Sequence, residues 1–161
     1  MAKSQTRDTT QDQPQDETAA MALEMLKTCL AGRVRQINRS MSSRYDEALR
    51  PSGMTANQLT LLCIIATLGP SRSAELQPYL GMEQSTLSRN LDRMIKKGWL
   101  KKLRDDDGRA HRLALTPKGR KALKEARPRW QEAQNWAEEL FGGAGARQVD
   151  KISKTLNPRI P

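Results

Sequence analysis

The sequence predicts a mainly α-helical fold with one short β-hairpin. Aliphatic residues recur at steps of three and four over long stretches, which is the spacing of an amphipathic helix. The only aromatic residues are one Phe, two Tyr and three Trp, so we expect a core of Leu, Ile, Met and Ala, a composition that favours helices. One turn, DDDG, separates two short segments with the imperfect alternation of strands.

The chain is basic, with 28 Lys and Arg against 18 Asp and Glu and a net charge of +10. Such a balance indicates nucleic acid or another anionic surface as the partner. No apolar run approaches the roughly 18 residues of a membrane span, and the N-terminus has no signal-peptide stretch. We therefore expect a cytoplasmic protein of one modest domain, with no membrane partner.

The sequence has no group of residues typical of a catalytic, metal or cofactor site. Two Cys and one His cannot supply the four ligands of a structural zinc site. No nucleophile–base set, phosphate-cradling Gly loop or carboxylate pair is present either. The sequence therefore predicts no metal, no cofactor and no enzyme activity.

Residues 1–20 contain no aromatic and no large aliphatic residue after the initial Met. They cannot bury enough surface to offset the entropy of ordering, so we expect a flexible arm, part of which can extend the next helix. From residue 23 to residue 49 the apolar positions follow a helical stripe, and RPSG at 50–53 ends it. A long helix over residues 22–49 is predicted.

A second helix begins after Thr55, a good N-cap, and ends before Gly69-Pro70. It is apolar nearly all round, so we expect it to be buried, with Cys63 in the core. Two further helices, AELQPYLG and MEQSTLSRNLDRMIKKG, are joined by a tight turn at Gly81, which predicts a helix-turn-helix. Pro78 leaves the geometry of the first helix open, and Glu83 is a poor N-cap for the second, for which Ser85 is the alternative.

The segments WLKKLR and RAHRLAL flank the DDDG turn and predict a two-stranded hairpin. Thr116 and Pro117 then begin another helix as N-cap and first helical residue. Pro128 is expected to kink that helix. The two Gly at 142–143 are expected to end it, giving helices over residues 117–141 and 146–157.

Three segments in this order resemble the MarR family of bacterial transcriptional regulators: MTANQLTLLCIIATLGP, SAELQPYLGMEQSTLSRNLDRMIKKGWL and RDDDGRAHRLALTPKGRKAL. The likeness covers about residues 24–157, and its most specific part is the D-G-R…L-x-L-T-x-K-G pattern. The resemblance implies a winged helix-turn-helix dimer. It divides the chain into an arm (1–20), a dimerisation helix (21–54), a DNA-binding lobe (55–115) and C-terminal dimerisation helices (116–161).

The second helix of a helix-turn-helix enters the major groove with its N-terminal part. The residues expected to contact DNA from this helix are Gln84, Ser85, Thr86, Ser88, Arg89 and Arg93. Among them, Arg89 is predicted to bond a guanine in a bidentate manner, and Arg93 a phosphate. Further phosphate contacts are expected from Thr55, Asn57, Ser73, Lys101 and Lys102. A merely solvated basic face is the alternative.

The hairpin raises a question, because three consecutive Asp lie between Gln84 and Lys121, where twelve Lys and Arg stand against four Asp. The resemblance implies that the hairpin is a wing whose tip arginine enters the minor groove. We expect Asp107 to orient Arg109 by a charge-assisted bond, while Gly108 permits the turn. Arg104 and Arg112 are the other predicted wing contacts, and an ordinary solvated turn is the alternative.

Two further expectations concern regulation. One branch of the family senses peroxide through a cysteine near the start of its first helix. Cys29 lies close to that place, although a buried or half-buried structural cysteine is the alternative. The resemblance also implies a small aromatic or amphipathic effector bound between the dimerisation region and the lobe, for which the candidate residues are Arg33, Met41 and Leu62.

The predicted function is sequence-specific binding of double-stranded DNA by a homodimer that recognises a pseudo-palindromic operator. Repression is the expected outcome, with release by an effector. Two alternatives stay open: an effector-independent DNA-binding protein of low specificity, and a winged-helix protein–protein adaptor without a DNA role.

Overall fold

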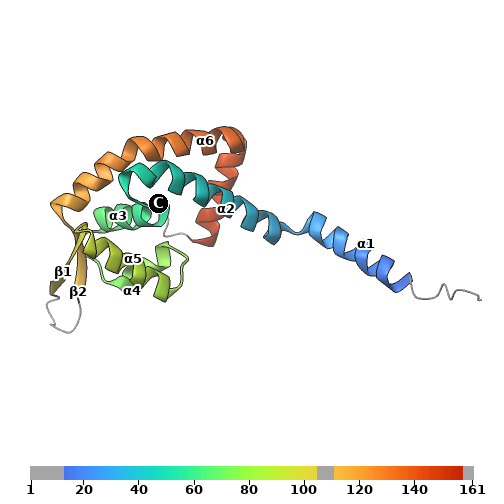
Figure 1. Cartoon of the computed structure of the whole chain (residues 1–161), viewed down its shortest axis with the longest axis horizontal. Coiled ribbons are helices and arrows are strands. Elements are labelled where there is room, and N and C mark those ends of the chain that lie inside the picture. Colours follow the sequence, from blue (N-terminus) through green and yellow to red (C-terminus); the bar gives the residue numbers. More distant parts are fainter. Residues whose placement is uncertain (1–12, 105–110, 158–161) are drawn as a thin grey trace, which may run out of the picture. The chain divides into compact units, whose positions relative to one another are not determined.

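The computed structural model describes residues 13–104 and 111–157 of the chain, which divide into two compact units between Ser40 and Met41. The mainly helical fold with one hairpin is confirmed (Figure 1). No helix among the described residues is long and apolar enough to span a membrane. The elements are α1 (Gln13–Thr28), α2 (Leu30–Leu49), η1 (Arg50–Ser52), α3 (Ala56–Leu68), α4 (Ser73–Leu76), η2 (Gln77–Tyr79), α5 (Gln84–Lys96), β1 (Leu100–Arg104), β2 (His111–Leu115) and α6 (Pro117–Leu156).

The N-terminal helices agree with the prediction in one place and differ from it in another. Part of the predicted arm of residues 1–20 continues the following helix, as the sequence allowed, from Gln13 onward, while residues 1–12 lie outside the described residues. The predicted helix over 22–49 is interrupted at Cys29. At this break the Arg33 guanidinium donates to the Lys27 carbonyl, and the Gly32 N–H donates to the Cys29 sulfur at 3.4 Å. Two helical backbone bonds are kept at the break, from the Cys29 N–H to the Met25 carbonyl at 2.9 Å and from the Arg33 N–H to the Cys29 carbonyl at 3.3 Å. Gly32 lowers the local helix propensity.

Helix α3 begins at the predicted cap. The Thr55 hydroxyl accepts from the Gln58 N–H, and the Gln58 side chain accepts from the Thr55 N–H, both at 3.3 Å. This reciprocal pair satisfies two of the amides that a helix start leaves without partners. The expectation that α3 is buried all round is wrong in one respect, because Cys63 is exposed. One face of the helix is turned away from the core.

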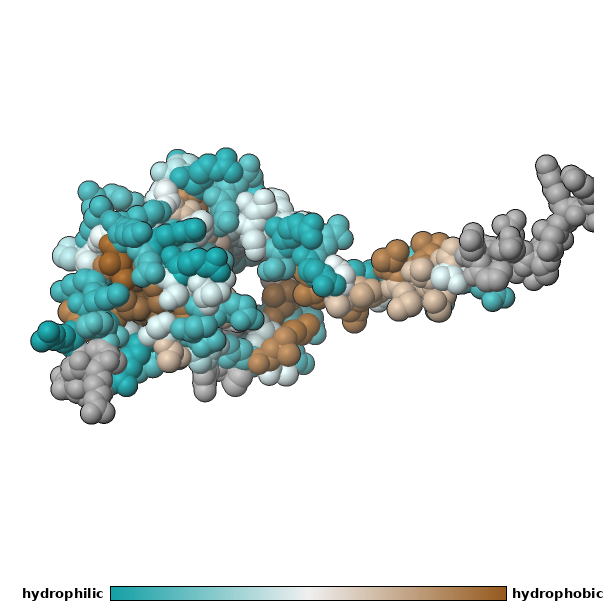
Figure 2. Space-filling model, turned by 60° about the horizontal axis from the view of Figure 1, so that its bottom comes forward, coloured by the Kyte–Doolittle hydropathy of each residue, from teal (hydrophilic) through white to brown (hydrophobic). Residues whose placement is uncertain are grey.

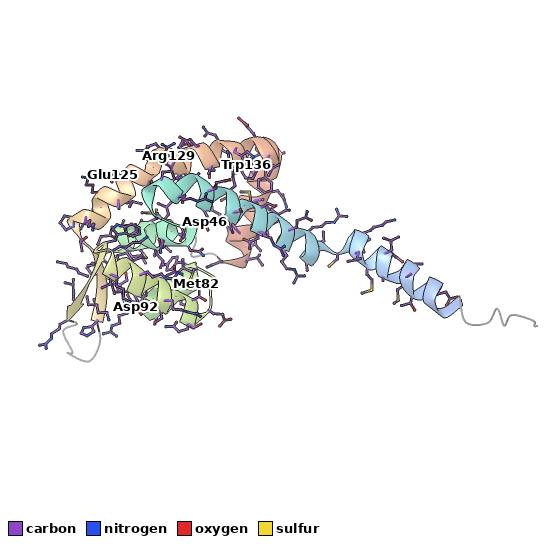
Figure 3. All side chains as sticks on the ribbon, viewed as in Figure 1. Asp46, Met82, Asp92, Glu125, Arg129 and Trp136 are labelled. Carbon is purple, nitrogen blue, oxygen red and sulfur yellow. The ribbon has the colours of Figure 1, made fainter. Side chains whose placement is uncertain are left out.

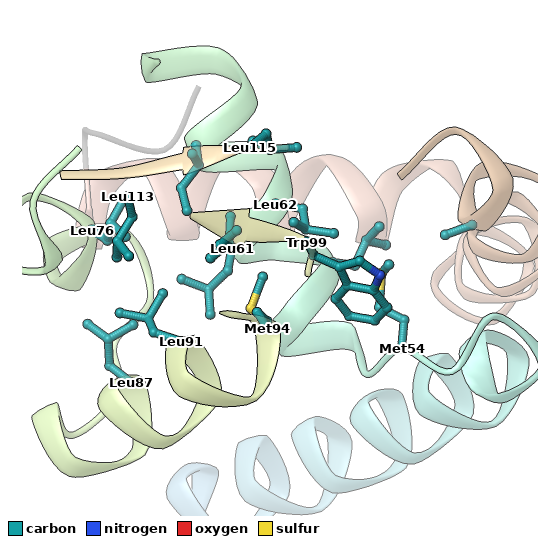
Figure 4. Close-up of a cluster of buried hydrophobic side chains, with 14 of the residues drawn as sticks. Met54, Leu61, Leu62, Leu76, Leu87, Leu91, Met94, Trp99, Leu113 and Leu115 are labelled. Atoms are coloured by element: carbon teal, nitrogen blue, oxygen red, sulfur yellow. The ribbon is translucent and has the colours of Figure 1, made fainter. Parts of the chain in front are cut away.

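The core of the lobe lies where α3, α4, α5 and the hairpin meet (Figure 4). Each fully buried Leu stabilises the fold by about 1.5–3 kcal/mol relative to exposure. The buried side chains of this core come from every one of these elements, so the inner side of α5 packs against the rest of the lobe. They include Leu61, Leu62, Leu76, Leu87, Leu91, Met94, Trp99, Leu113 and Leu115.

The hairpin is antiparallel, with Leu100 opposite Leu115 and Arg104 opposite His111. The second strand also pairs on its other side, because Ser71 and Leu113 exchange backbone hydrogen bonds of 3.1 and 2.8 Å. This second pairing joins the hairpin to the start of the helix-turn-helix.

The junction between α5, the hairpin and α6 is built around Thr116. Its hydroxyl accepts from the Gly119 N–H at 3.0 Å and donates to the Gly98 carbonyl at 2.6 Å. Its own N–H donates to the Trp99 carbonyl at 3.0 Å. A Cβ on Gly119 would lie 2.2 Å from that carbonyl oxygen, so only glycine fits.

Helix α6 keeps helical dihedral angles through Pro128 and departs from them at Gly142 (φ 63°, ψ 165°). Gly adopts this positive φ without steric cost. The two predicted C-terminal helices therefore meet at a kink at Gly142. Before the kink, the Tyr45 hydroxyl donates to the Gln134 side chain at 2.7 Å, which ties the end of α2 to α6.

Replacing Gly119 by Ala should destabilise the protein by about 1–3 kcal/mol, because the added methyl group overlaps a buried backbone carbonyl. Urea unfolding followed by circular dichroism measures this. Gly143→Ala is the matched control, since its Cβ meets only the flexible end of Arg147 within a helix; it should be neutral or stabilising by up to about 1 kcal/mol. Equal unfolding midpoints for the two variants would contradict the role of the junction.

Candidate nucleic-acid interface

The outer face of α5 carries most of the residues predicted to contact the major groove. Its inner side buries Leu87, Leu91 and Met94. The outer side exposes Gln84, Ser85, Ser88, Arg89 and Arg93, with Thr86 half-buried at its edge. The only acidic residue along this helix is Asp92, also exposed (Figure 3). The helix therefore presents a polar, basic surface to solvent.

Arg89 is folded back along its own helix. Its Nε donates to the Ser85 carbonyl and one of its terminal nitrogens donates to the Ser85 hydroxyl, both at 3.1 Å. Ser85 therefore holds Arg89 and does not cap the helix. The N-cap is Glu83, which makes no side-chain capping bond. The start of α5 keeps its positive dipole end without a side-chain acceptor at the cap.

The predicted phosphate contacts fall into accessible and inaccessible groups. Lys101, Lys102 and Asn57 are exposed. Thr55 is also exposed, with its hydroxyl engaged in the cap of α3. The Ser73 oxygen is buried and has no hydrogen-bond partner among the described residues. The Ser73 hydroxyl is therefore not accessible to a phosphate, while the residue itself is half-buried at the start of α4, and the contact predicted there stays a prediction.

The described part of the wing presents cations from both strands. Arg104 is exposed at the end of β1, and Arg112 donates from one terminal nitrogen to the Pro70 carbonyl at 3.2 Å. The tip residues Asp107, Gly108 and Arg109 lie outside the described residues. The orientation of Arg109 by Asp107 stays a prediction.

A cavity of about 590 Å³ lies where the end of α2, the start of α3 and the last turn of α5 meet. The sequence did not predict this cavity, and of its lining residues only Arg93 and Thr55 were expected to contact DNA. The Asp46 carboxylate accepts from the Ala56 N–H at 2.6 Å, and the Lys97 ammonium donates to the Gly53 carbonyl. The basic lining residues are Arg50, Arg93, Lys96 and Lys97. The signal that could have found them is the run of cations at the C-terminal end of α5.

The three residues proposed for an effector pocket do not line one cavity. Leu62 is completely buried in the core, and Met41 lines a cavity of about 250 Å³ between α2 and α6. Arg33 is exposed and bonds the Lys27 carbonyl. Cys29 is exposed, which contradicts the buried or half-buried alternative and leaves its redox role as a prediction.

A different cavity, which we call the α3–α6 groove, has a volume of about 460 Å³. It is lined by Leu59, Thr60, Cys63, Leu123, Lys124, Arg127 and Trp130. The lining is apolar apart from Thr60 and two cations. Burial raises the pKa of the Cys63 thiol although part of the residue is exposed. The sequence signal for this groove was weak, because Leu123 and Trp130 lie on the same helical stripe as core residues.

Comparison with known proteins identifies the kind of fold. A family model described as a winged helix DNA-binding domain matches residues 54–119. The uncharacterized HTH-type transcriptional regulator YwoH of Bacillus subtilis is 30% identical over 95 residues, which cover 57% of this chain and 69% of YwoH. The multiple antibiotic resistance protein MarR of Salmonella typhimurium is 29% identical over 126 residues, which cover 78% of this chain and 86% of that protein.

Solved structures agree with this result. The crystal structure of the transcriptional regulator MosR of M. tuberculosis in complex with DNA is 32% identical to the chain, with a TM-score of 0.68. The likeness covers 83% of this chain and 99% of MosR. Nearly the whole of that regulator therefore has a counterpart here.

Alkylation of Cys63 should require a higher pH in the folded protein than in the unfolded chain. Burial disfavours the thiolate, so at a given pH less of the reactive form is present. The pH dependence of iodoacetamide labelling, measured by mass spectrometry of the Cys63 peptide, tests this. The same peptide in urea is the control, and identical pH profiles in the two conditions would contradict the expectation.

Proposed function

The chain belongs to the MarR family of winged-helix transcriptional regulators, and we propose that it represses transcription by binding a pseudo-palindromic DNA operator as a homodimer. Its relatives are DNA-binding regulators, and the chain is a regulator rather than an enzyme. The observation that carries the proposal is the exposed polar face of α5, with Arg89 and Arg93, beside the cations of the wing strands. In this proposal residues 55–115 form the DNA-binding lobe.

The proposed dimer is supported by apolar surface that a single subunit leaves in water. Leu140 is 60% exposed and Leu156 is 80% exposed, and Val34, Ile37, Val149 and Ile152 are also exposed. Patches of this kind mark interaction sites, because removing apolar surface from water is favourable by about 25 cal/mol per Å². We propose that residues 21–54 and 116–161 form the dimer interface. Two lobes would then contact half-sites about 34 Å apart.

We further propose that a small effector molecule releases the protein from DNA. The α3–α6 groove lies between a helix of the lobe and a helix of the dimerisation region. Its apolar lining with Lys124 and Arg127 suits a small aromatic or amphipathic anion. Such a molecule changes DNA binding only if it binds the DNA-incompetent arrangement of the lobes more tightly.

The test of function is selection of bound fragments from random-sequence duplex DNA. A regulator enriches one sequence and binds it about 10³-fold or more above random DNA. Equal binding to all fragments would favour the low-specificity protein, and no binding would favour the adaptor. Repeating the selection with peroxide, on the wild type and Cys29→Ser, tests the redox proposal for the exposed Cys29.

Arg89→Ala should weaken binding to the selected operator by about 1–3 kcal/mol and relax the sequence preference at one base pair of each half-site. Fluorescence anisotropy with the operator and its single-base variants measures both effects. Lys121→Ala is the control, because this exposed cation pairs with Glu125 on α6 and lies outside the proposed DNA-binding lobe of residues 55–115. Loss of affinity without any change in preference would assign Arg89 to a phosphate.

Replacing both Lys101 and Lys102 by Ala should weaken binding to specific and to random DNA alike. It should also reduce the magnitude of the slope of log binding constant against log salt concentration by roughly 2. Each exposed lysine of β1 would neutralise one phosphate and release its counterions. Titrations at several salt concentrations measure the slope. An unchanged slope would mean that neither lysine meets the backbone.

A further inference from the structure

Helix α1 has an apolar surface that is exposed along its length. Every described side chain from Glu17 to Thr28 is exposed, including Met21, Leu23, Met25 and Leu26 at 51–76%. Figure 2 shows the brown side chains along this stretch. A single helix of 16 residues is marginally stable in water and gains most of its stability from packing. We therefore expect this apolar surface of α1 to pack against a partner.

The chemistry of this surface is apolar with an acidic border. Met21 and Met25 are four residues apart and lie on the same side of the helix. Glu17 lies one turn before Met21 on that side, and Glu24 is beside it. Lys27 falls on a different side, because two residues correspond to about 200° of rotation.

The α3–α6 groove is the complementary surface. Its apolar lining includes Leu59, Leu123 and Trp130, and its charged residues are both cations, Lys124 and Arg127. An apolar helix face with acidic edges matches an apolar groove with basic edges, because charge complementarity selects the partner and its orientation. In a chain of net charge +10, an acidic border on α1 is itself unusual.

We infer that α1 of each subunit docks in the α3–α6 groove of the other subunit and acts as a latch in the homodimer. The inference rests on the proposed dimer and adds a second contact to it. A second copy is the occupant because residues 21–28 of α1 already belong to the proposed dimer interface, so that the latch continues this interface into the groove. A two-fold arrangement then closes with both grooves filled.

The latch would connect the two functional parts of its partner. The groove has one wall from α3 in the DNA-binding lobe and the other from α6 in the dimerisation region. A helix seated between these walls holds the lobe in one position relative to the dimer. An effector that occupies the same groove would displace the latch and free the lobe. Such an effector binds the dimer without the docked latch more tightly than the dimer with it, and release requires this difference.

Crosslinking between two differently sized subunits tests the latch. One subunit carries Met25→Cys, Cys29→Ser and Cys63→Ser, so its only thiol is on α1. The other is tagged and carries Cys29→Ser, so its only thiol is Cys63 in the groove. After the two are mixed and exchanged, a short bismaleimide at mildly alkaline pH should give a 25–63 product that can form only between subunits. The matched control replaces Met25→Cys by Lys27→Cys and should give several-fold less product.

A second pair of variants tests the charge match. Glu24→Lys should lower the crosslinking yield roughly two- to five-fold, and Arg127→Glu in the other subunit should restore it, since exposed ion pairs have modest effects of this size. Both side chains are exposed, so neither change should unfold the protein. Sedimentation of each mixture reports the dimer independently.

The outcomes separate the latch from the dimer. A 25–63 product that exceeds the 27–63 product supports the latch. A stable dimer with no such product, or with equal products from both positions, would overturn the latch and leave the proposed function intact. A monomer in sedimentation would overturn the latch and the proposed dimer together.

Discussion

The contact of Gly119 with the Trp99 carbonyl is the constraint on which the rest of the lobe depends. Within a few residues, the end of α5, the first residues of the hairpin and the start of α6 meet around the Thr116 hydroxyl. Gly98, with φ of 74°, lets the chain turn from α5 into β1 at this point. The end of α5, the hairpin and the start of α6 are therefore held together at one point. The motif L-T-P-K-G thus forms a joint between α6 and the elements of the winged helix.

Around this joint, several cations are held by backbone carbonyls. Arg89 bonds the Ser85 carbonyl, Arg112 bonds the Pro70 carbonyl, and Lys97 bonds the Gly53 carbonyl while lying 4.3 Å from the centre of the Trp99 ring. A side chain that is already ordered loses less conformational entropy on binding. The lobe therefore offers a fixed pattern of charge, and its exposed lysines on β1 add attraction without fixed geometry.

Local signals in the sequence predicted much of this structure. The Thr55 cap, the order of the helices and the hairpin on either side of DDDG each depend on neighbouring residues, which a single sequence shows. The pairing of Ser71 with Leu113, the burial of the Ser73 oxygen and the exposure of Cys63 depend on residues distant in the sequence. The break at Cys29 interrupts an apolar stripe that is continuous in the sequence, so periodicity could not predict it. Periodicity identified the helices but not which apolar face is left for a partner.

The proposed latch would make the energetics of the proposed release modest. Moving a two-state population from 1:99 to 99:1 requires about 5.5 kcal/mol of differential binding. A symmetric dimer has two grooves, so each effector molecule would need to supply only about 2.7 kcal/mol, half of that total. This is comparable to the full burial of one Met or Leu side chain, about 1.5–3 kcal/mol. A small aromatic anion that replaces the Met21–Met25 face in each groove is therefore sufficient in principle. The dimer contacts of the C-terminal helices can remain in place while the lobes are released.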